Sequence, residues 1–344
     1  MAALEERAGA ILPESVTSYY ASGSADGLSV AEASTAWDSW RLRPRVLRDV
    51  SSVSTQVRLL GSTLATPVGV APSAAHRLAH QEGEAATAAG VAAATSLLVL
   101  STRSTTRLAT VAGCGADWWM QVYVLRDRGV SDEIARQAAS HGAGALVLTG
   151  DTPVVGPKAG VAVPDLPVER LLPVLEERDA DEHLVQARDV TLDDIERLSS
   201  VSGLPVLVKG VLRADDALDC ASAGAAGVVV SNHGGRQLDG AVPTAFALGE
   251  VADALAGSGL AVLVDGGIRT GRHVLSALAL GADAVLLGRP VLWALAVGGA
   301  DGVASLLAEM TEQTRLDLAL AGCRGVSDSS PHLLWHPHLR GRSV

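Results

Sequence analysis

The sequence is poor in lysine and carries a surplus of negative charge. Only two of its 344 residues are lysines, Lys158 and Lys209, and the formal net charge is −11. An acidic chain whose positive residues are dispersed argues against nucleic acid or an anionic membrane as the main partner. Because arginine is otherwise preferred throughout, a lysine that persists at the end of a strand is a candidate for a chemical role.

Signals for export, membrane insertion, metal binding and disulfide formation are also lacking. The first 14 residues include acidic side chains and no apolar core region, unlike a signal peptide. The most apolar stretch, Val274–Ala300, is interrupted by Asp283, Arg289 and glycines, which indicates a helix, a strand and a second helix in a protein core. The three cysteines are far apart and odd in number. We therefore expect free thiols, no metal site and a reducing, cytoplasmic location.

From Pro67 onward, short apolar runs alternate with alanine-rich helical patterns. Eight runs are candidate strands: Pro67–Ala71, Ala93–Leu100, Trp118–Val124, Ala145–Thr149, Pro205–Val208, Gly227–Val230, Ala261–Val264 and Ala284–Leu287. Helical patterns between them include Glu82–Ala89, Asp132–Ala139, Ala214–Ala221 and Gly271–Leu280. Such apolar runs are typical of a parallel sheet, and eight β/α units favour a closed (β/α)8 TIM barrel over an open doubly wound sheet. No GxGxxG follows the first run, so a Rossmann dinucleotide site is not supported.

The predicted barrel has two additions. Residues 1–66 form an N-terminal helical extension packed on the barrel, with a helical stretch at Pro13–Ala21 and an arginine-rich connector at Arg41–Arg48. Residues 67–344 form the barrel, and residues 152–190 are a long loop after its fourth strand that holds five of the fourteen prolines. A loop of this length is usually a lid or specificity loop, or else disordered.

Polar side chains follow all eight candidate strands, where barrel enzymes place their active sites. In chain order these strand ends carry Ala71-Pro72-Ser73, Ser101, Gln121 with Tyr123, Thr149 with Asp151, Lys209, Ser231-Asn232-His233, Asp265-Gly266-Gly267 and Gly288-Arg289. The last two ends offer glycine backbone N–H groups and a guanidinium, and barrels commonly bind phosphate there. The pattern predicts an enzyme with a phosphate-bearing substrate or cofactor.

Residues 231–239, with the sequence SNHGGRQLD, resemble the active-site signature of the FMN-dependent 2-hydroxy acid dehydrogenases and oxidases. That family includes glycolate oxidase, lactate oxidase, mandelate dehydrogenase and hydroxymandelate oxidase. The resemblance covers most of the chain. Besides the signature, it is carried by the segments 19–23, 43–45, 71–74, 80–84, 121–123, 149–153, 207–210 and 288–290, and it ends at about Arg324. It implies a TIM barrel with bound FMN.

The resemblance also implies catalytic and substrate-binding roles. His233 would be the base that takes a proton as the substrate is oxidised, with Asp151 paired to it. Arg236 would hold the substrate carboxylate in its planar fork. Tyr19 and Tyr123 would donate hydrogen bonds to the carboxylate and to the reacting oxygen. Whether hydrogen leaves the carbon as a proton or as a hydride stays open.

The implied FMN contacts are spread over the strand ends. Lys209 would place positive charge near N1 and O2 of the flavin and stabilise its anionic reduced form. The other implied contacts are Ser101, Gln121 and Thr149 at the ring edge, Ala71, Pro72 and Ser73 on its other side, Asp265, Gly267, Arg269, Gly288 and Arg289 at the ribityl chain and phosphate, and Ser231. Two of three tyrosines and one of two lysines fall in site positions, which supports the assignment.

Two positions depart from the family pattern. Lys158 stands where family members usually carry an arginine that clamps the carboxylate, and an ammonium cannot form a bidentate fork. It would bind the substrate or be a surface residue without a role. Arg103 stands where glycolate oxidases place a substrate-facing tryptophan. It would replace the clamp, meet a second acidic group on the substrate, or lie exposed to solvent.

The sequence therefore predicts an enzyme that oxidises an (S)-2-hydroxy acid to a 2-oxo acid with FMN, which oxygen or another acceptor then reoxidises. The substrate would be aromatic or bulky, such as a mandelate, or else lactate or glycolate. Two alternatives remain: a flavin-binding barrel with isomerase-like, non-oxidative chemistry, and one that has lost turnover. The resemblance further implies a homotetramer.

Overall fold

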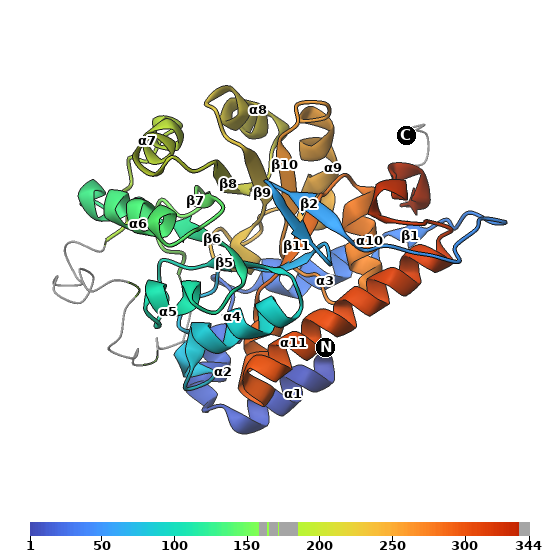
Figure 1. Ribbon diagram of the computed structural model, residues 1–344, viewed down its shortest axis with the longest axis horizontal. Coiled ribbons are helices and arrows are strands. Elements are labelled where there is room, and N and C mark those ends of the chain that lie inside the picture. The colour runs from blue at the N-terminus through green and yellow to red at the C-terminus, as the bar shows by residue number, and fades with distance from the viewer. Residues whose placement is uncertain (158–163, 165–170, 172–184, 337–344) are drawn as a thin grey trace.

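Eight parallel strands close into a barrel, which confirms the predicted fold (Figure 1). The computed structural model describes residues 1–157, 164, 171 and 185–336. Around the barrel the strands are β4 (Val68–Val70), β5 (Leu97–Leu100), β6 (Asp117–Val122), β7 (Leu146–Thr149), β8 (Val206–Val211), β9 (Gly227–Val230), β10 (Ala261–Val264) and β11 (Ala284–Leu287). Each strand pairs with the next in the chain, and β11 pairs with β4 to close the ring.

Helices surround the barrel and bury its outer face. They are α4 (Gly83–Ala93), α5 (Leu108–Ala112), α6 (Arg128–Ser140), α7 (Asp193–Ser202), α8 (Ala214–Ser222), α9 (Thr244–Ala254), α10 (Gly271–Ala279) and α11 (Arg289–Leu320). The start predicted for the second strand, at Ala93, is wrong. Alanine is the strongest helix former, so this residue continues α4, and the turn at Thr95, with φ +47°, precedes β5.

Alternate residues of each strand point into and out of the barrel. Leu97 and Val99 of β5 belong to an interior cluster, whereas Leu98 and Leu100 pack outward against the helices. The end of the interior away from the carboxyl ends of the strands is closed by a hairpin of β2 (Val57–Leu59) and β3 (Ser62–Leu64). Leu59 and Leu64, the last residues of these two strands, are buried in the same cluster. The barrel is therefore a packed core at one end, and the site forms at the other.

The N-terminal extension contains three helices where the sequence predicted one. These are α1 (Ala2–Ile11), α2 (Glu14–Ala21) and α3 (Leu28–Asp38), and a short strand, β1 (Arg41–Leu42), pairs with β12 (Leu334–Trp335). Helices α1 and α2 pack on α11, while α3 packs on α9 and α10. The extension thus reaches from the outer helices of the barrel to the rim formed by the carboxyl ends of the strands.

Among the described helices, α11 is long and apolar enough to cross a membrane by those two measures alone. It is not one continuous helix, because Gly298 and Gly299 leave helical geometry and Gly299 has φ +56°. Its two parts pack against α1, α4 and α10. Together with α10 and β11 it forms the helix–strand–helix arrangement predicted for Val274–Ala300.

Candidate active site

The carboxyl ends of the strands surround a cavity of about 340 Å³. Most predicted site residues line it: Tyr19, Ala71, Pro72, Ser73, Ser101, Arg103, Tyr123, Lys209, His233, Arg236, Asp265, Gly267, Arg269, Gly288 and Arg289. Four others, Gln121, Thr149, Asp151 and Ser231, lie behind the lining and hydrogen-bond to it or to one another. The predicted Lys158 lies outside the described residues. Residues far apart in the sequence thus share one cavity.

His233 and Asp151 form a hydrogen-bonded pair at the ends of β9 and β7. Nδ1 of His233 lies 2.9 Å from Oδ1 of Asp151, and the backbone N–H of His233 donates to Oγ of Ser231. His233 has φ +58°, a left-handed conformation that a residue with a side chain adopts only under constraint. Since Nδ1 is engaged by the carboxylate, Nε2 is the ring nitrogen available to a ligand in the cavity.

Buried charges in and behind the cavity lining are paired. Burial by itself raises the pKa of Asp151, but the hydrogen bond to His233 and the charge of Lys209 hold that pKa below its ordinary value. Burial by itself lowers the pKa of Lys209, yet the carboxylates of Asp265 and Asp151 outweigh it and raise that pKa. The Lys209 ammonium lies 3.2 Å from Asp265 and donates to Ser231 at 2.8 Å. Lys209 therefore stays charged although it is only 4% exposed.

The position of Lys209 depends on an irregularity in β8. The register of β8 against β9 shifts between Lys209 and Val211, and Gly210 has φ +107°. A Cβ on Gly210 would lie 2.4 Å from Cβ of Asp151. Glycine is required here because the backbone is left-handed and because Asp151 occupies the space of a side chain.

Gln121 connects three neighbouring strand ends. Its Oε1 accepts from the backbone N–H of Thr102 at 3.0 Å and from Oγ of Ser101 at 3.3 Å. Its Nε2 donates to Oγ1 of Thr149 at 2.9 Å. These buried hydrogen bonds fix the orientation of the amide and make a rigid polar edge along one side of the cavity.

Three arginines place positive charge in the cavity. Burial lowers the pKa of Arg289 to about 10, with the charges of Arg236 and Arg269 adding to the effect, and burial also lowers the pKa of Arg236 and Arg269. Among the described residues, none of the three forms an ion pair with a carboxylate within 4.0 Å. Guanidiniums gathered in this way need an anionic ligand to balance them.

Residues 265–269, here called the phosphate loop, follow β10 beside these arginines. Gly266 and Gly267 have φ +85° and +77°, and a Cβ on Gly267 would lie 2.1 Å from the carbonyl oxygen of Ala33. At the end of the neighbouring strand β11, Gly288 precedes α11. Backbone N–H groups, small residues and guanidiniums together fit the phosphate of a bound cofactor or substrate.

Comparison with known proteins decides whether this phosphate belongs to a cofactor or to a substrate. Residues 8–336 match the family described as FMN-dependent dehydrogenase. The chain belongs to this family. It is 40% identical to 4-hydroxymandelate oxidase of Amycolatopsis orientalis, with 95% of each chain covered, and 39% identical to L-lactate oxidase of Nostoc sp., with 94% of each covered. A solved structure of mandelate oxidase with (S)-4-hydroxymandelic acid has a TM-score of 0.90 at 40% identity, with 97% of each chain covered.

The cofactor of this FMN-dependent dehydrogenase family member is FMN, and another mandelate oxidase structure, 39% identical, contains an FMN adduct. The cavity fits FMN in two respects. The phosphate loop and the arginines supply an anion site, and Oδ1 of Asp265 is buried without a hydrogen-bond partner, so it can accept from a ligand hydroxyl. Asp265, Gly267, Arg269, Gly288 and Arg289 would hold the ribityl phosphate, while Lys209 and the Gln121 edge would contact the ring.

Two arginines of this family member also bind the N-terminal extension. Arg236 donates from Nη1 to the carbonyl oxygens of Tyr19 and Ser22 at 2.9 and 2.8 Å, and its guanidinium lies over the Tyr19 ring. Arg289 donates to the carbonyl oxygens of Tyr20 and Ser22 at 3.0 and 2.9 Å. Toward the described residues Arg236 donates only from Nη1, so Nε and Nη2 form the edge that can meet a substrate carboxylate.

Tyr123 and Arg103 form one wall of the cavity. Burial raises the pKa of Tyr123, with the charge of Arg103 acting in the opposite direction, so the phenol keeps its proton and can donate a hydrogen bond. The guanidinium carbon of Arg103 lies 5.7 Å from the centroid of the Tyr123 ring. Arg103 lines the cavity and is also exposed to solvent, so its role in binding the substrate stays a prediction.

Other cavity residues were not predicted. Tyr20 donates from its hydroxyl to the carbonyl oxygen of Ala75 at 2.7 Å. Gln237 donates to Oγ1 of Thr152 at 3.0 Å and accepts from the backbone N–H of Gly156 at 2.8 Å. Gln186 also lines the cavity. Tyr20 and Gln237 stand inside recognised sequence segments and could have been found, whereas Gln186, at the end of the long loop, carries no sequence signal.

Proposed function

We propose that this protein oxidises an (S)-2-hydroxy acid to the corresponding 2-oxo acid. The observation that carries the proposal is the hydrogen-bonded pair of His233 and Asp151 in the same cavity as Arg236. A base, a group that stabilises its protonated form and a carboxylate clamp are what this reaction requires of the protein. The 4-hydroxymandelate oxidase and L-lactate oxidase relatives, by name, act on acids of this class.

The side chains divide the work as follows. Oxidation removes two electrons and two protons from the H–C–OH group, and bound FMN would accept both electrons and the proton that His233 does not take. Nε2 of His233 takes one of the protons, and the Asp151 carboxylate stabilises the imidazolium that results. The free edge of Arg236 holds the carboxylate. The Lys209 ammonium would provide positive charge to stabilise the negative charge that the flavin gains on reduction.

Isomerase-like chemistry and a lapsed flavin-binding module are disfavoured by the same residues. Neither function needs a base, its carboxylate partner and a carboxylate clamp together. Only Lys158, in place of a second arginine clamp, favours loss of turnover, and the intact pair of His233 and Asp151 outweighs it.

An aromatic or bulky substrate such as a mandelate fits better than glycolate. Arg103 leaves no tryptophan at the cavity wall where glycolate oxidases carry one, and several similar solved structures are mandelate oxidases. We further propose that oxygen reoxidises the flavin, because the named relatives are oxidases. Reoxidation in aerated buffer with release of hydrogen peroxide supports this, and reoxidation only by an added artificial acceptor opposes it.

The flavin itself and a panel of acids test the proposal. Acid treatment of the purified protein should release FMN; release of FAD or of no flavin would contradict the assignment. Anaerobic mixing with (S)-mandelate, (S)-lactate, glycolate and an (S)-2-hydroxy dicarboxylate should then bleach the yellow flavin band for at least one acid. Bleaching by none of them would favour the lapsed module.

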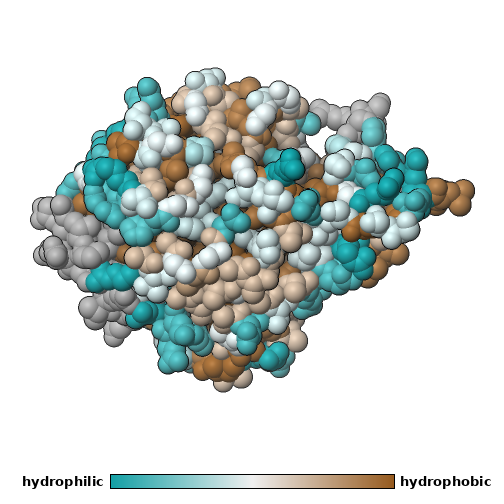
Figure 2. Space-filling view, in the orientation of Figure 1, coloured by the Kyte–Doolittle hydropathy of each residue, from teal (hydrophilic) through white to brown (hydrophobic). Residues whose placement is uncertain are grey.

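We also propose a homotetramer. The segment between β1 and β2 projects from the barrel (Figure 1), and the tip of the projection is hydrophobic (Figure 2). This segment contains Val46 and Leu47, which are 78% and 102% exposed. Exposed apolar side chains on a projecting arm favour burial against another subunit. Light scattering should give four times the 35.1 kDa chain mass, and replacing both residues by serine should lower it. A wild-type mass of one chain would refute the tetramer.

A further inference from the structure

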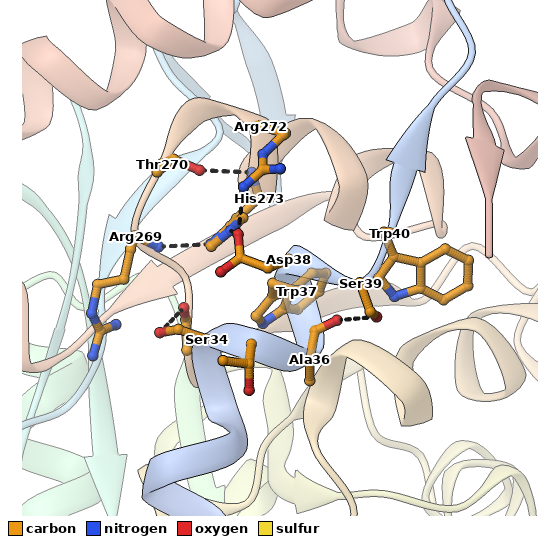
Figure 3. A network of polar contacts seen from close by, with 12 residues as sticks. Ser34, Ala36, Trp37, Asp38, Ser39, Trp40, Arg269, Thr270, Arg272 and His273 are labelled. Atoms are coloured by element: carbon orange, nitrogen blue, oxygen red, sulfur yellow. Dashed lines mark hydrogen bonds and ion pairs between the residues drawn. The ribbon is translucent and has the colours of Figure 1, made fainter. Parts of the chain in front are cut away.

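A buried histidine lies behind the phosphate loop, on the side away from the cavity. His273 is in the first turn of α10 and only 2% exposed. Figure 3 shows it between the backbone of the phosphate loop and Asp38, the last residue of α3. Neither His273 nor Asp38 lines the cavity, and the chemistry proposed above uses neither of them.

The hydrogen bonds of His273 define its tautomer. The backbone N–H of Arg269 donates to Nδ1 at 3.2 Å, so Nδ1 carries no hydrogen. Nε2, which lies 3.0 Å from Oδ1 of Asp38, must then be the donor to the carboxylate. Burial lowers the pKa of His273, with Asp38 acting in the opposite direction and Arg272 and Arg269 adding to the lowering. This agrees with a neutral ring that accepts on one side and donates on the other.

The bond from Arg269 to His273 also determines where the Arg269 side chain lies. The peptide between Ile268 and Arg269 is trans, so its carbonyl oxygen points opposite to the N–H group that His273 accepts. That carbonyl oxygen accepts from Nη1 of Arg269 itself at 2.8 Å. His273 thus fixes the plane of this peptide at its N–H edge, and the carbonyl oxygen at the opposite edge binds the Arg269 guanidinium, which lines the cavity.

Helix α3 orients the two preceding peptides of the phosphate loop in a similar way. Nε1 of Trp37 donates to the carbonyl oxygen of Gly266 at 2.8 Å, and Oγ of Ser34 donates to that of Gly267 at 2.9 Å. In trans peptides the next N–H groups, those of Gly267 and Ile268, then point away from α3. Both residues line the cavity, and neither N–H group donates to another described residue.

We propose that Asp38 and His273 are a positioning pair that orients the phosphate loop and the Arg269 guanidinium for the phosphate group of FMN. The pair touches neither cofactor nor substrate, and acts through the Ile268–Arg269 peptide. The proposal rests on FMN as the cofactor and on its phosphate lying at this loop. It is independent of which acid is oxidised.

Two ligands that differ only in the phosphate group separate positioning from general stability. Dissociation constants of the flavin-free protein for FMN and for riboflavin are measured by quenching of flavin fluorescence. His273→Gln removes the acceptor for the Arg269 N–H and leaves a buried donor unpaired, so FMN should bind roughly ten- to a hundredfold more weakly. Binding of riboflavin should not change. His273→Asn, whose amide oxygen can take the place of Nδ1, should recover part of the loss.

Arg272→Gln is the matched control. Arg272 also forms an ion pair with Asp38 but makes no hydrogen bond or ion pair with the phosphate loop among the described residues, so its replacement should leave the FMN-to-riboflavin ratio unchanged. Asp38→Asn is the second variant, for the case that replacement of the buried His273 prevents folding. Because Asp38 is half-exposed, this variant should fold, and it should show a smaller loss of affinity for FMN and none for riboflavin. A parallel loss of both flavins, or an equal loss in Arg272→Gln, would overturn the positioning role. A wild-type protein that binds riboflavin as tightly as FMN would overturn the phosphate assignment itself.

Discussion

The turn after β9 and the phosphate loop after β10 solve the same geometric problem with different residues. Both need left-handed backbone at the rim of the barrel, and both contact the N-terminal extension, where Ser24 donates to Gly235 and Ser34 to Gly267. The phosphate loop uses glycine at its left-handed positions. The turn after β9 uses His233, with φ +58°, and then glycines.

The difference shows what each segment contributes. A phosphate is recognised by backbone N–H groups, so a side chain at Gly267 is unnecessary and would strike the Ala33 carbonyl. Proton transfer needs an imidazole, so strain at His233 is tolerated and offset by its bonds to Asp151 and Ser231. Strain is therefore placed where a side chain does the chemistry.

The largest effect is expected from replacing His233, which tests whether the turn after β9 contributes through its side chain. His233→Ala should leave FMN bound but slow flavin reduction by about 10²–10⁴-fold, which is the typical contribution of a general base. Stopped-flow absorbance under anaerobic conditions, with the FMN content measured on the same sample, gives both values. Near-normal reduction in this variant would remove His233 from the chemistry.

Gly267→Ala tests whether the phosphate loop contributes through its backbone. The new Cβ would lie 2.1 Å from the Ala33 oxygen at φ +77°, so the free energy of unfolding should fall by about 2 kcal/mol or more and FMN should be lost. Gly257→Ala is the control, since Gly257 has φ +74° but no atom within 4 Å of an added Cβ. Its cost should be about 1 kcal/mol. Equal denaturation midpoints for the two variants would show that the contact with α3 is unimportant.

A smaller effect is expected at the cavity wall. Arg103→Ala should lower kcat/KM for the best 2-hydroxy acid by roughly ten- to a hundredfold, the worth of a charged hydrogen bond, and Lys158→Ala should lower it less. The loss should shrink for the methyl ester of the same acid, which has no anion to hold. If acid and ester suffer equally, Arg103 is structural; if Lys158→Ala costs more, the loop lysine is the clamp.

The smallest effect concerns pH. Because the folded pKa of Asp151 is lowered, this carboxylate stabilises the fold above the unfolded pKa of about 4, and the contribution disappears as the pH falls through the folded value. The free energy of unfolding of wild type should therefore exceed that of Asp151→Asn near neutral pH, and this difference should shrink as the pH falls. Burial raises the pKa of Asp283, so its ionised carboxylate destabilises the fold near neutral pH, and wild type should gain stability relative to Asp283→Asn as the pH falls. Urea titrations between pH 3 and 7, a range about the ordinary carboxyl pKa, check both signs.

Strands whose apolar runs are buried on both faces could be predicted closely. The bounds of β9, β10 and β11 coincide with the predicted runs. A predicted bound was wrong where two preferences compete, as at Ala93. Helices α1 and α3, which pack against α11 and α9, were not predicted as separate helices. The β2–β3 hairpin was missed because its strands have only three residues each.

The candidate site was predictable because barrel topology gathers the strand ends, so position along the chain is enough to place Lys209 or His233. Contacts between distant segments were not. The bond between Asp38 and His273 joins residues 235 positions apart, and no local pattern marks either of them. The same holds for Gln186, which reaches the cavity from the long loop.

Anaerobic reduction of the protein by (S)-mandelate, compared with its 2-deuterated form and with (R)-mandelate, tests the central claim most directly. The account predicts that the (S)-acid bleaches the flavin band, that deuterium at C2 slows bleaching because the Cα–H bond breaks, and that the (R)-acid reacts far more slowly. Should FMN-loaded protein show no bleaching with (S)-mandelate, (S)-lactate or glycolate, or equal rates with both enantiomers of mandelate, the cavity built from His233, Asp151 and Arg236 would not be a site for stereospecific 2-hydroxy acid oxidation.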